Sequence, residues 1–205
     1  MFELDNITFK NKQRTILSLD NKRVAKGENT LLLGPSGCGK TSLLNIMAGL
    51  MRPTSGDVYF EDTSYGSLSN SDIDKLRAKN FGFIFQTMHL LGHLNITQNI
   101  ALAQTAPNPQ RIQTLMSELG LTGKDKQKAQ DRSAGEAQPV AIARAGSNNP
   151  AVIFADEPTS ALDDANTQKV MDLLFDQAPK TGASIIAATH DHRIKKYFDT
   201  VWEIA

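Results

Sequence analysis

The fold of this chain of 205 residues follows from one segment, Leu31-Leu32-Leu33-Gly34-Pro35-Ser36-Gly37-Cys38-Gly39-Lys40-Thr41-Ser42-Leu43-Leu44. In it, an apolar run leads into a glycine-rich turn, and the turn leads into residues typical of a helix. Positions 34–41 match the phosphate-binding pattern G-x-x-x-x-G-K-[ST]. The glycines let successive backbone N–H groups point into one concavity, and the start of the helix adds partial positive charge. The segment therefore predicts a polyphosphate site between a strand and a helix.

Two side chains at the end of this segment carry specific roles. Lys40 is expected to place its ammonium group between a β- and a γ-phosphate, and the Thr41 hydroxyl is expected to ligate the Mg²⁺ that bridges them. The alternative is a glycine-rich turn without a ligand. It is disfavoured because the required strand and helix flank the motif on the correct sides. A polyphosphate with Mg²⁺ is therefore the expected ligand.

The composition excludes several classes of protein. Lys plus Arg and Asp plus Glu each total 22, so the formal net charge is zero. Such a chain offers no strongly basic face, and we expect no nucleic-acid partner. The single cysteine, Cys38, forms no disulfide framework and favours a reducing compartment. Residues 1–5 are not typical of a secretory signal, and no apolar run approaches the roughly 18 residues of a membrane span. Any contact with a membrane is expected to go through a partner.

Apolar runs and alternating patterns, bounded by turn residues, predict the strands. They are expected at 2–9, 15–24, 29–33, 58–60, 81–85, 151–155, 185–189 and 200–204. The first two are expected to pair antiparallel, and the last to lie at a sheet edge.

Helical patterns separate these strands. The helix that begins at Lys40 is expected to keep Leu50 on its core face and to be stopped by Pro53. A capping box at 71–74 is expected to open a short helix up to Lys79.

From about residue 87 to residue 144 the pattern is helical, which indicates an insert. Either Asn95 or Thr97 is expected to cap a helix that runs through Leu102. A second helix is expected from Asn108-Pro109, closed by Gly120, because proline favours the first helical position and glycine the position just past the end. Another helix is expected after Leu162-Asp163.

Polar side chains follow several of the expected strands at the points where they end. The carboxyl ends of parallel strands share one edge of a sheet, where ligands bind. Asp156 is expected to hold Mg²⁺ through water, and Glu157 to accept a proton from the water that attacks the γ-phosphate. Gln86 is expected to contact both the metal shell and that water, and His190 to hydrogen-bond the γ-phosphate. Taken singly, Gln86 and His190 fit structural roles equally well, but their order after Lys40 indicates a site.

The ordered motifs of the chain resemble those of one family. They are GPSGCGKT at 34–41, Gln86, Ser133-Ala134-Gly135-Glu136, Val140-Ala141-Ile142-Ala143-Arg144-Ala145, FADEPTSALD at 154–163 and Thr189-His190-Asp191. Over essentially the whole chain, this succession resembles the nucleotide-binding subunit of ABC transporters. The resemblance implies an α/β phosphate-loop ATPase. Its core, with an antiparallel β-subdomain, would cover 1–86 and 146–205, and an inserted helical subdomain at 87–145 would reach a transmembrane permease.

The resemblance also implies an assembly and a location. Two copies would pair head to tail on binding ATP and remain monomeric without it. Ser133, Gly135 and Glu136 of one copy would cover the ATP held by Lys40 of the other. The chain would be cytoplasmic and peripheral, held on the inner face of the plasma membrane by the permease.

Three further segments resemble one type within this family. They are Phe83-Ile84-Phe85-Gln86, Leu90-Leu91 and Asn95-Ile96-Thr97-Gln98-Asn99. With a Gly-Glu ending to the signature segment, they look like the lipoprotein-release, macrolide-export and glycolipid-export type.

The signature segment departs from the family pattern, which usually reads LSGGQ or LSGGE followed closely by Gln-Arg. Here Arg132 replaces the leucine, Ala134 the first glycine and Pro139 the later arginine. If a helix begins just after Ser133, Pro139 removes one backbone hydrogen bond and crowds the preceding turn, at a cost of about 3 kcal/mol. The helix is therefore expected to kink at Pro139 or to start later.

A second departure lies near the first strand. Relatives place an aromatic residue there that stacks on adenine, whereas this chain has Lys10, Asn11 and Lys12. Phe9 either supplies the stacking or, as we favour, is a buried strand residue.

The expected function is an ATPase subunit that powers a membrane exporter. One alternative is a nucleotide-binding module with impaired turnover, because of the changes at Arg132, Ala134 and Pro139. Another is a non-transport ABC ATPase of DNA repair or chromosome work. The chain has neither the heptads nor the cysteine clusters of such proteins, and the intact Lys40 and Glu157 argue against lost turnover.

Overall fold

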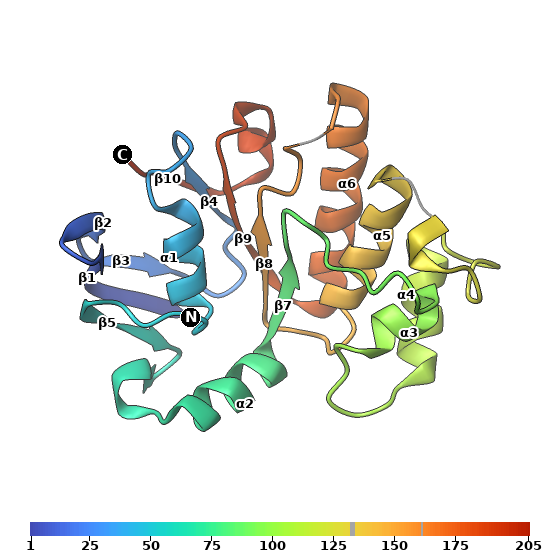
Figure 1. Cartoon of the computed structure of the whole chain (residues 1–205), viewed down its shortest axis with the longest axis horizontal. Coiled ribbons are helices and arrows are strands. Elements are labelled where there is room, and N and C mark those ends of the chain that lie inside the picture. Colours follow the sequence, from blue (N-terminus) through green and yellow to red (C-terminus); the bar gives the residue numbers. More distant parts are fainter. Residues whose placement is uncertain (132–133, 161) are drawn as a thin grey trace.

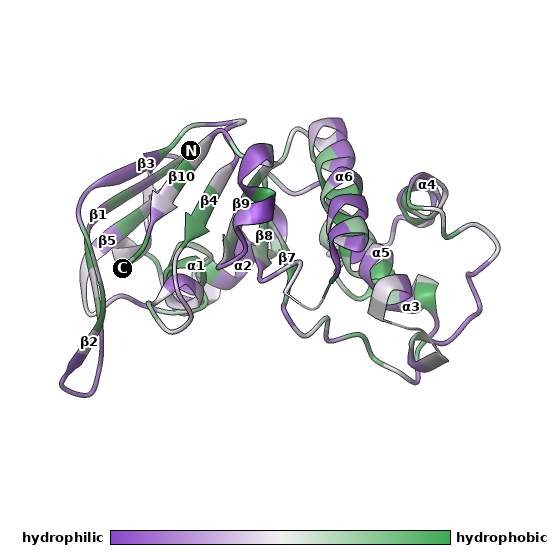
Figure 2. Ribbon diagram, turned by 90° about the horizontal axis from the view of Figure 1, so that it is seen from above, coloured by the Kyte–Doolittle hydropathy of each residue, from purple (hydrophilic) through white to green (hydrophobic). Residues whose placement is uncertain are grey.

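The computed structural model describes residues 1–131, 134–160 and 162–205. They form an antiparallel sheet, a parallel sheet and a group of helices (Figure 1). In both views α3, α4 and α5 lie on the side of the parallel sheet away from the antiparallel sheet (Figure 1, Figure 2). The mixed α/β fold agrees with the predicted class.

The antiparallel sheet has the strand order β2-β1-β5-β6, with β3 also paired to β1. Its strands are β1 (Phe2–Asn11), β2 (Arg14–Leu19), β3 (Lys22–Val24), β5 (Ser55–Phe60) and β6 (Thr63–Ser64). The single strand predicted at 15–24 was wrong, because β2 and β3 are separate and pair with the two ends of β1. The break is held by a hydrogen bond of 3.0 Å from the Asn6 backbone N–H to Asn21 Oδ1.

The parallel sheet has the strand order β10-β4-β9-β8-β7. Its strands are β4 (Thr30–Leu33), β7 (Phe81–Ile84), β8 (Val152–Asp156), β9 (Ser184–Thr189) and β10 (Thr200–Glu203). Every residue of β4 and β9 is buried, because both faces of the sheet are covered. Leu31 and Leu33 pack toward α3–α6, while Leu32 packs toward α1 and the antiparallel sheet. The predicted edge position of the last strand is confirmed.

Helices cover this sheet, and some of them lie between β7 and β8 along the chain. They are α1 (Lys40–Met47), α2 (Asn70–Asn80), α3 (Ile96–Ala101), α4 (Pro109–Glu118), α5 (Ala134–Ala145) and α6 (Asp164–Thr181). Short 3-10 helices lie at η1 (Tyr65–Ser67), η2 (Ala129–Asp131) and η3 (His192–Tyr197). No helix in the described ranges is both long enough and apolar enough to cross a bilayer.

Two predicted helix boundaries were wrong. Helix α1 ends at Met47, because Gly49 takes a φ of +68°, and Leu50 is 45% exposed rather than part of the core. Helix α2 is capped by Ser69, whose hydroxyl accepts from the Asp72 N–H, so the predicted box at 71–74 lies inside the first turn.

The caps of α3 and α4 agree with the sequence. Of the two candidates, Asn95 caps α3 in a full capping box with Gln98. Asn108 caps α4, Pro109 is its first residue, and Gly120 follows its end with a φ of +67°.

Helix α5 begins at Ala134 and continues through Pro139. The alternative that this helix starts later in the sequence is therefore excluded. Pro139 cannot donate to the carbonyl of Gly135, so the first turn of α5 lacks a bond that an ordinary residue would make. The neighbouring Gln138 is buried and donates its side-chain amide to the Pro158 carbonyl at 3.0 Å. Arg132 and Ser133, two of the predicted signature residues, lie outside the described residues.

Candidate functional site

The loop between β4 and α1 forms one wall of a cavity of about 300 Å³. Gly37 and Gly39 have backbone φ values of +84° and +100°. Residues that carry a Cβ rarely adopt such values. A Cβ on Gly34 would lie 2.1 Å from the Ile204 carbonyl oxygen. The glycines of the pattern are therefore required by the backbone path. The cavity is lined by Ile16, Ser36, Gly37, Gly39, Lys40, Thr41, Ser42, Gln86, Glu157 and His190.

Lys40 is 5% exposed and is the first residue of α1, directly after this loop. Its Nζ donates to the carbonyl oxygens of Gly34 at 2.8 Å and Pro35 at 2.9 Å. It also lies 4.0 Å from Glu157 Oε1. A buried ammonium is costly unless it is paired, and here two carbonyls and one carboxylate hold it at the cavity wall.

Thr41 and Asp156 form the oxygen-rich side of the cavity. Thr41 Oγ1 donates to Asp156 Oδ1 at 3.0 Å. Burial raises the pKa of Asp156, and the hydrogen bond from Thr41 partly opposes this rise. A hydroxyl, a carboxylate and the nearby amide of Gln86 are hard oxygen donors, so this set fits Mg²⁺.

Glu157 is held in one orientation by four contacts. Its Oε2 accepts from Thr189 Oγ1 at 2.7 Å, and its Oε1 lies 2.9 Å from His190 Nδ1 and 4.0 Å from Lys40 Nζ. Its backbone N–H donates to the Ala188 carbonyl at 2.8 Å, and its φ of +47° is unusual for a residue with a side chain. Strained backbone of this kind persists where the surroundings determine it fully, which is common at functional sites.

The structure brings together most of the site residues that the sequence predicts. Lys40, Thr41, Gln86, Glu157 and His190 line one cavity, and Asp156 bonds to Thr41. Pro35 contributes through its carbonyl, and Cys38 is half-buried within the loop.

The predicted signature residues do not join this cavity within the described part of the chain. Gly135 and Glu136 are exposed near the start of α5 and are not among the lining residues, and Ser133 is not described. Three contributors were missed, among them Ser42 of α1, which lines the cavity. Thr189 positions Glu157, and its signal was a polar residue at the end of an apolar strand. Ile16 comes from β2 and has no sequence signal.

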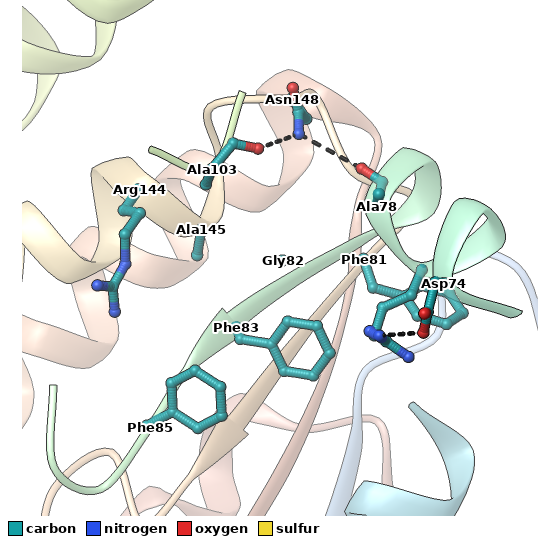
Figure 3. A pocket seen from close by; sticks show the side chains of 11 residues that line it. Asp74, Ala78, Phe81, Gly82, Phe83, Phe85, Ala103, Arg144, Ala145 and Asn148 are labelled. Atoms are coloured by element: carbon teal, nitrogen blue, oxygen red, sulfur yellow. Dashed lines mark hydrogen bonds and ion pairs between the residues drawn. The ribbon is translucent and has the colours of Figure 1, made fainter. Parts of the chain in front are cut away.

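A second pocket, of about 280 Å³, lies between α2, β7 and α5 (Figure 3). The rings of Phe83 and Phe85 stack with centroids 5.5 Å apart. Asn148 donates to the carbonyls of Ala78 and Ala103 and so joins α2 to the segment after α3.

Arg144 of α5 lines the same pocket and fastens the segment that follows Gln86. Its guanidinium donates to the carbonyls of His89 at 2.8 Å and Met88 at 2.5 Å. The wall of this pocket is therefore connected to the chain that carries Gln86 into the first cavity.

The segment after His190 is fastened by Asp191, whose carboxylate is 8% exposed. It accepts from Arg193 Nη2 at 2.8 Å and from Thr159 Oγ1 at 2.9 Å. The hydrogen bonds from Arg193 lower the pKa of Asp191 to about 2, from an ordinary value of 3.8. The carboxylate thus joins β9 to the segment that follows Glu157.

Asp191→Asn should lower the free energy of unfolding at neutral pH, because the folded state holds this carboxylate ionised. The difference in pKa corresponds to about 2 kcal/mol. A depressed pKa in the folded state gives stability that is present above about pH 4 and is lost as the pH falls toward 2. The difference in free energy of unfolding between parent and variant should therefore shrink by more than half at about pH 2.5. Urea unfolding across this range measures it, with the exposed Asp176→Asn as control. A difference in free energy of unfolding that does not change with pH would contradict this account.

The sequence profile of the family described as "ABC transporter" matches residues 17–160. The lipoprotein-releasing system ATP-binding protein LolD of Buchnera aphidicola subsp. Schizaphis graminum is 36% identical over 92% of this chain and 86% of its own length. The macrolide export ATP-binding/permease protein MacB of Haemophilus ducreyi is 37% identical over 91% of this chain. The chain spans only 28% of that relative.

Solved structures give the same result. The dimeric structure of MJ0796, described as a bacterial ABC transporter cassette, superposes with a TM-score of 0.88 at 31% identity, covering 100% of this chain and 94% of that one. A second structure of MJ0796 is a dimeric post-hydrolysis state bound to ADP and Pi. With the cavity described above, these findings show that the chain belongs to the ABC transporter family, as an ABC-type ATPase component related to LolD and MacB.

Proposed function

We propose that the chain binds ATP with Mg²⁺ in the cavity at the end of the parallel sheet and hydrolyses it to power an exporter or lipoprotein-release transporter. The observation that carries this proposal is the position of Glu157. It is fixed by Thr189 and His190 and lies 4.0 Å from Lys40, beside the Thr41–Asp156 pair. A general base, a phosphate clamp and metal-binding oxygens thus share one cavity.

Each side chain has a distinct task in this proposal. The loop 34–39 and the start of α1 bind the phosphates, and Lys40 exchanges its carbonyl partners for phosphate oxygens. Thr41, Asp156 and Gln86 hold Mg²⁺, which would neutralise charge on the β- and γ-phosphates. Glu157 accepts the proton of the attacking water. His190 keeps that carboxylate oriented and donates toward the γ-phosphate.

We further propose a head-to-tail dimer that closes on ATP and separates without it. Gly135 and Glu136 are exposed at the start of α5, away from the cavity of their own chain, which supports a role on a second copy together with Ser133. The dimeric form of MJ0796 is consistent with this. The proposed core covers 1–86 and 146–205, and the proposed helical subdomain covers 87–145.

The pocket of Figure 3 is the proposed contact with the transmembrane permease. It lies where core and helical subdomain meet, it presents the partly buried rings of Phe83 and Phe85, and Arg144 links it to the segment after Gln86. Through this contact the chain would be peripheral on the cytoplasmic face of the inner membrane.

Two measurements test the function. The purified chain should release phosphate from ATP only when Mg²⁺ is present. A tagged chain purified from detergent-solubilised membranes of its own cells should carry a multi-span membrane protein with it. Phosphate release without Mg²⁺ would overturn the metal assignment, and a chain recovered without any membrane protein would overturn the transport role.

Restoring the signature with Ala134→Gly and Pro139→Arg should strengthen ATP-dependent dimerisation roughly thirtyfold. This assumes that each departure weakens the contact across the dimer by about 1 kcal/mol, comparable to one net hydrogen bond. Pro139→Arg also returns a donor to the first turn of α5. Light scattering with ATP measures dimerisation in a Glu157→Gln background, which prevents turnover. An unrestored chain that already dimerises as fully would show that the departures are tolerated.

A further inference from the structure

We propose that Gln138 on α5 is a positioning residue for hydrolysis, because it fixes the backbone that leaves the general base Glu157. Gln138 is not among the described residues that line the phosphate cavity. It holds the carbonyl of Pro158, one residue beyond the base, against α5. The inference rests on the proposed function, because it assumes that Glu157 accepts the proton of the attacking water.

Gln138 makes a buried polar contact between two segments that lie apart in the sequence. Its side chain is 4% exposed, and its Nε2 donates to the Pro158 carbonyl oxygen at 3.0 Å. Pro158 is buried as well. A buried carbonyl that loses its donor is left unsatisfied, which costs more than the net contribution of the bond. The contact therefore keeps Pro158 beside α5.

Pro158 has only one backbone group that can be held in this way. Proline has no backbone N–H, so its carbonyl is its single hydrogen-bonding group. The residue before a proline favours extended backbone, yet Glu157 has a φ of +47°. Such a conformation persists only where surrounding contacts hold it. The Glu157 N–H is held by the Ala188 carbonyl at 2.8 Å, and Gln138 supplies a contact on the other side of the residue.

The opposite side of the same segment is fastened to β9. Thr159 Oγ1 donates to Asp191 Oδ2 at 2.9 Å, and the Asp191 backbone N–H donates to Thr189 Oγ1 at 3.0 Å. Thr189 Oγ1 in turn donates to Glu157 Oε2 at 2.7 Å. These contacts support the carboxylate from the sheet. The bond from Gln138 adds a separate support from the helix layer.

Helix α5 is a firm base for this bond. Residues 140–143, which lie just beyond Gln138 on the helix, are all buried. The helix packs against α6 and β7 (Figure 1). Side chains carried by packed helices and strands are positioned more accurately than those on loops. Gln138 can therefore fix the position of Pro158.

The chemical step is expected to depend on this support. A displacement of about 1 Å at a reacting group can cost on the order of a hundredfold in rate. Without the amide of Gln138, the Pro158 carbonyl has to turn or bind water, and Glu157 loses part of its fixed orientation. Thr189 still holds one carboxylate oxygen, so we expect a smaller loss of rate. Lys40 and Thr41 are not bonded to Gln138, so the binding of phosphate should be unchanged.

Single-turnover phosphate release from MgATP by the whole chain tests the proposal. Gln138→Met keeps the length and approximate volume of the side chain but removes the amide donor. It should lower the rate about tenfold, whereas the affinities for ATP and tripolyphosphate, measured by calorimetric titration, should stay within about twofold of the parent. The matched control is Gln168→Met, which changes an exposed glutamine of α6 and should equal the parent in rate and affinity.

A second background separates positioning from a general loss of structure. Glu157→Gln already removes the general base, so a residue that acts through Glu157 has no carboxylate left to position. Gln138→Met added to Glu157→Gln should therefore leave the residual rate within about twofold of that of Glu157→Gln alone.

Three outcomes would overturn the inference. A hydrolysis rate of Gln138→Met equal to that of the parent would show that the Pro158 carbonyl needs no donor. Weakened binding of ATP and tripolyphosphate together with the lower rate would indicate a purely structural role, and so would a further loss of similar size in the Glu157→Gln background. A parent chain that releases no phosphate from MgATP would instead overturn the proposed function.

Discussion

Glu157→Gln should reduce the rate of ATP hydrolysis at least about a hundredfold while leaving ATP affinity nearly unchanged. A positioned general base contributes on the order of 10²- to 10⁴-fold to a rate, and glutamine keeps the shape of the side chain but cannot take a proton. The amide can still bond Thr189 and His190, which hold the native carboxylate at 2.7 Å and 2.9 Å. The variant should therefore fold normally and accumulate an ATP-bound dimer.

Phosphate release under single-turnover conditions measures the chemical step, and ATP titration measures binding separately. Glu203→Gln on β10 changes an exposed carboxylate in the same way and serves as control. Equal turnover in the Glu157 variant and the parent would remove Glu157 from the mechanism. A variant with weakened ATP binding would instead point to a role in shaping the phosphate cavity.

Lys40→Ala should weaken ATP binding at least about a hundredfold. The Lys40 ammonium is 5% exposed and is held by carbonyls of the loop, so it is already oriented toward the phosphate cavity. Hydrogen bonds between an ammonium and phosphate oxygens are charge-assisted and roughly twice as strong as neutral ones. Without the lysine, the Glu157 carboxylate 4.0 Å away would also meet the γ-phosphate without an intervening cation.

Equilibrium titration with ATP and with tripolyphosphate measures this loss, and both ligands should be affected equally because the contact is to phosphate. The exposed Lys26→Ala is the control, and thermal unfolding of the free chain checks that the variant folds. Retained affinity for tripolyphosphate would contradict the assignment of Lys40 as the phosphate clamp.

The strands of the parallel sheet could be predicted because their burial on both faces leaves a continuous apolar run in the sequence. The residues at their ends were found for the same reason, since Gln86, Asp156 and His190 each interrupt or follow such a run. The two helix boundaries that were predicted wrongly, in α1 and α2, depend on local backbone geometry. Leu50 has the spacing of a core residue, but Gly49 turns the chain outward before it.

The sequence by itself determined the phosphate loop, the order of the parallel-sheet motifs and the family resemblance, because glycine geometry and strand burial are written locally in the residues. Tertiary structure alone decided how the side chains of the site are oriented. Thr189 orients Glu157, Arg144 fastens the segment after Gln86, and the pairing of β2 with β1 brings Ile16 to the phosphate cavity. Each of these contacts joins segments far apart in the chain, or depends on strand register, and neither leaves a signal in a single sequence.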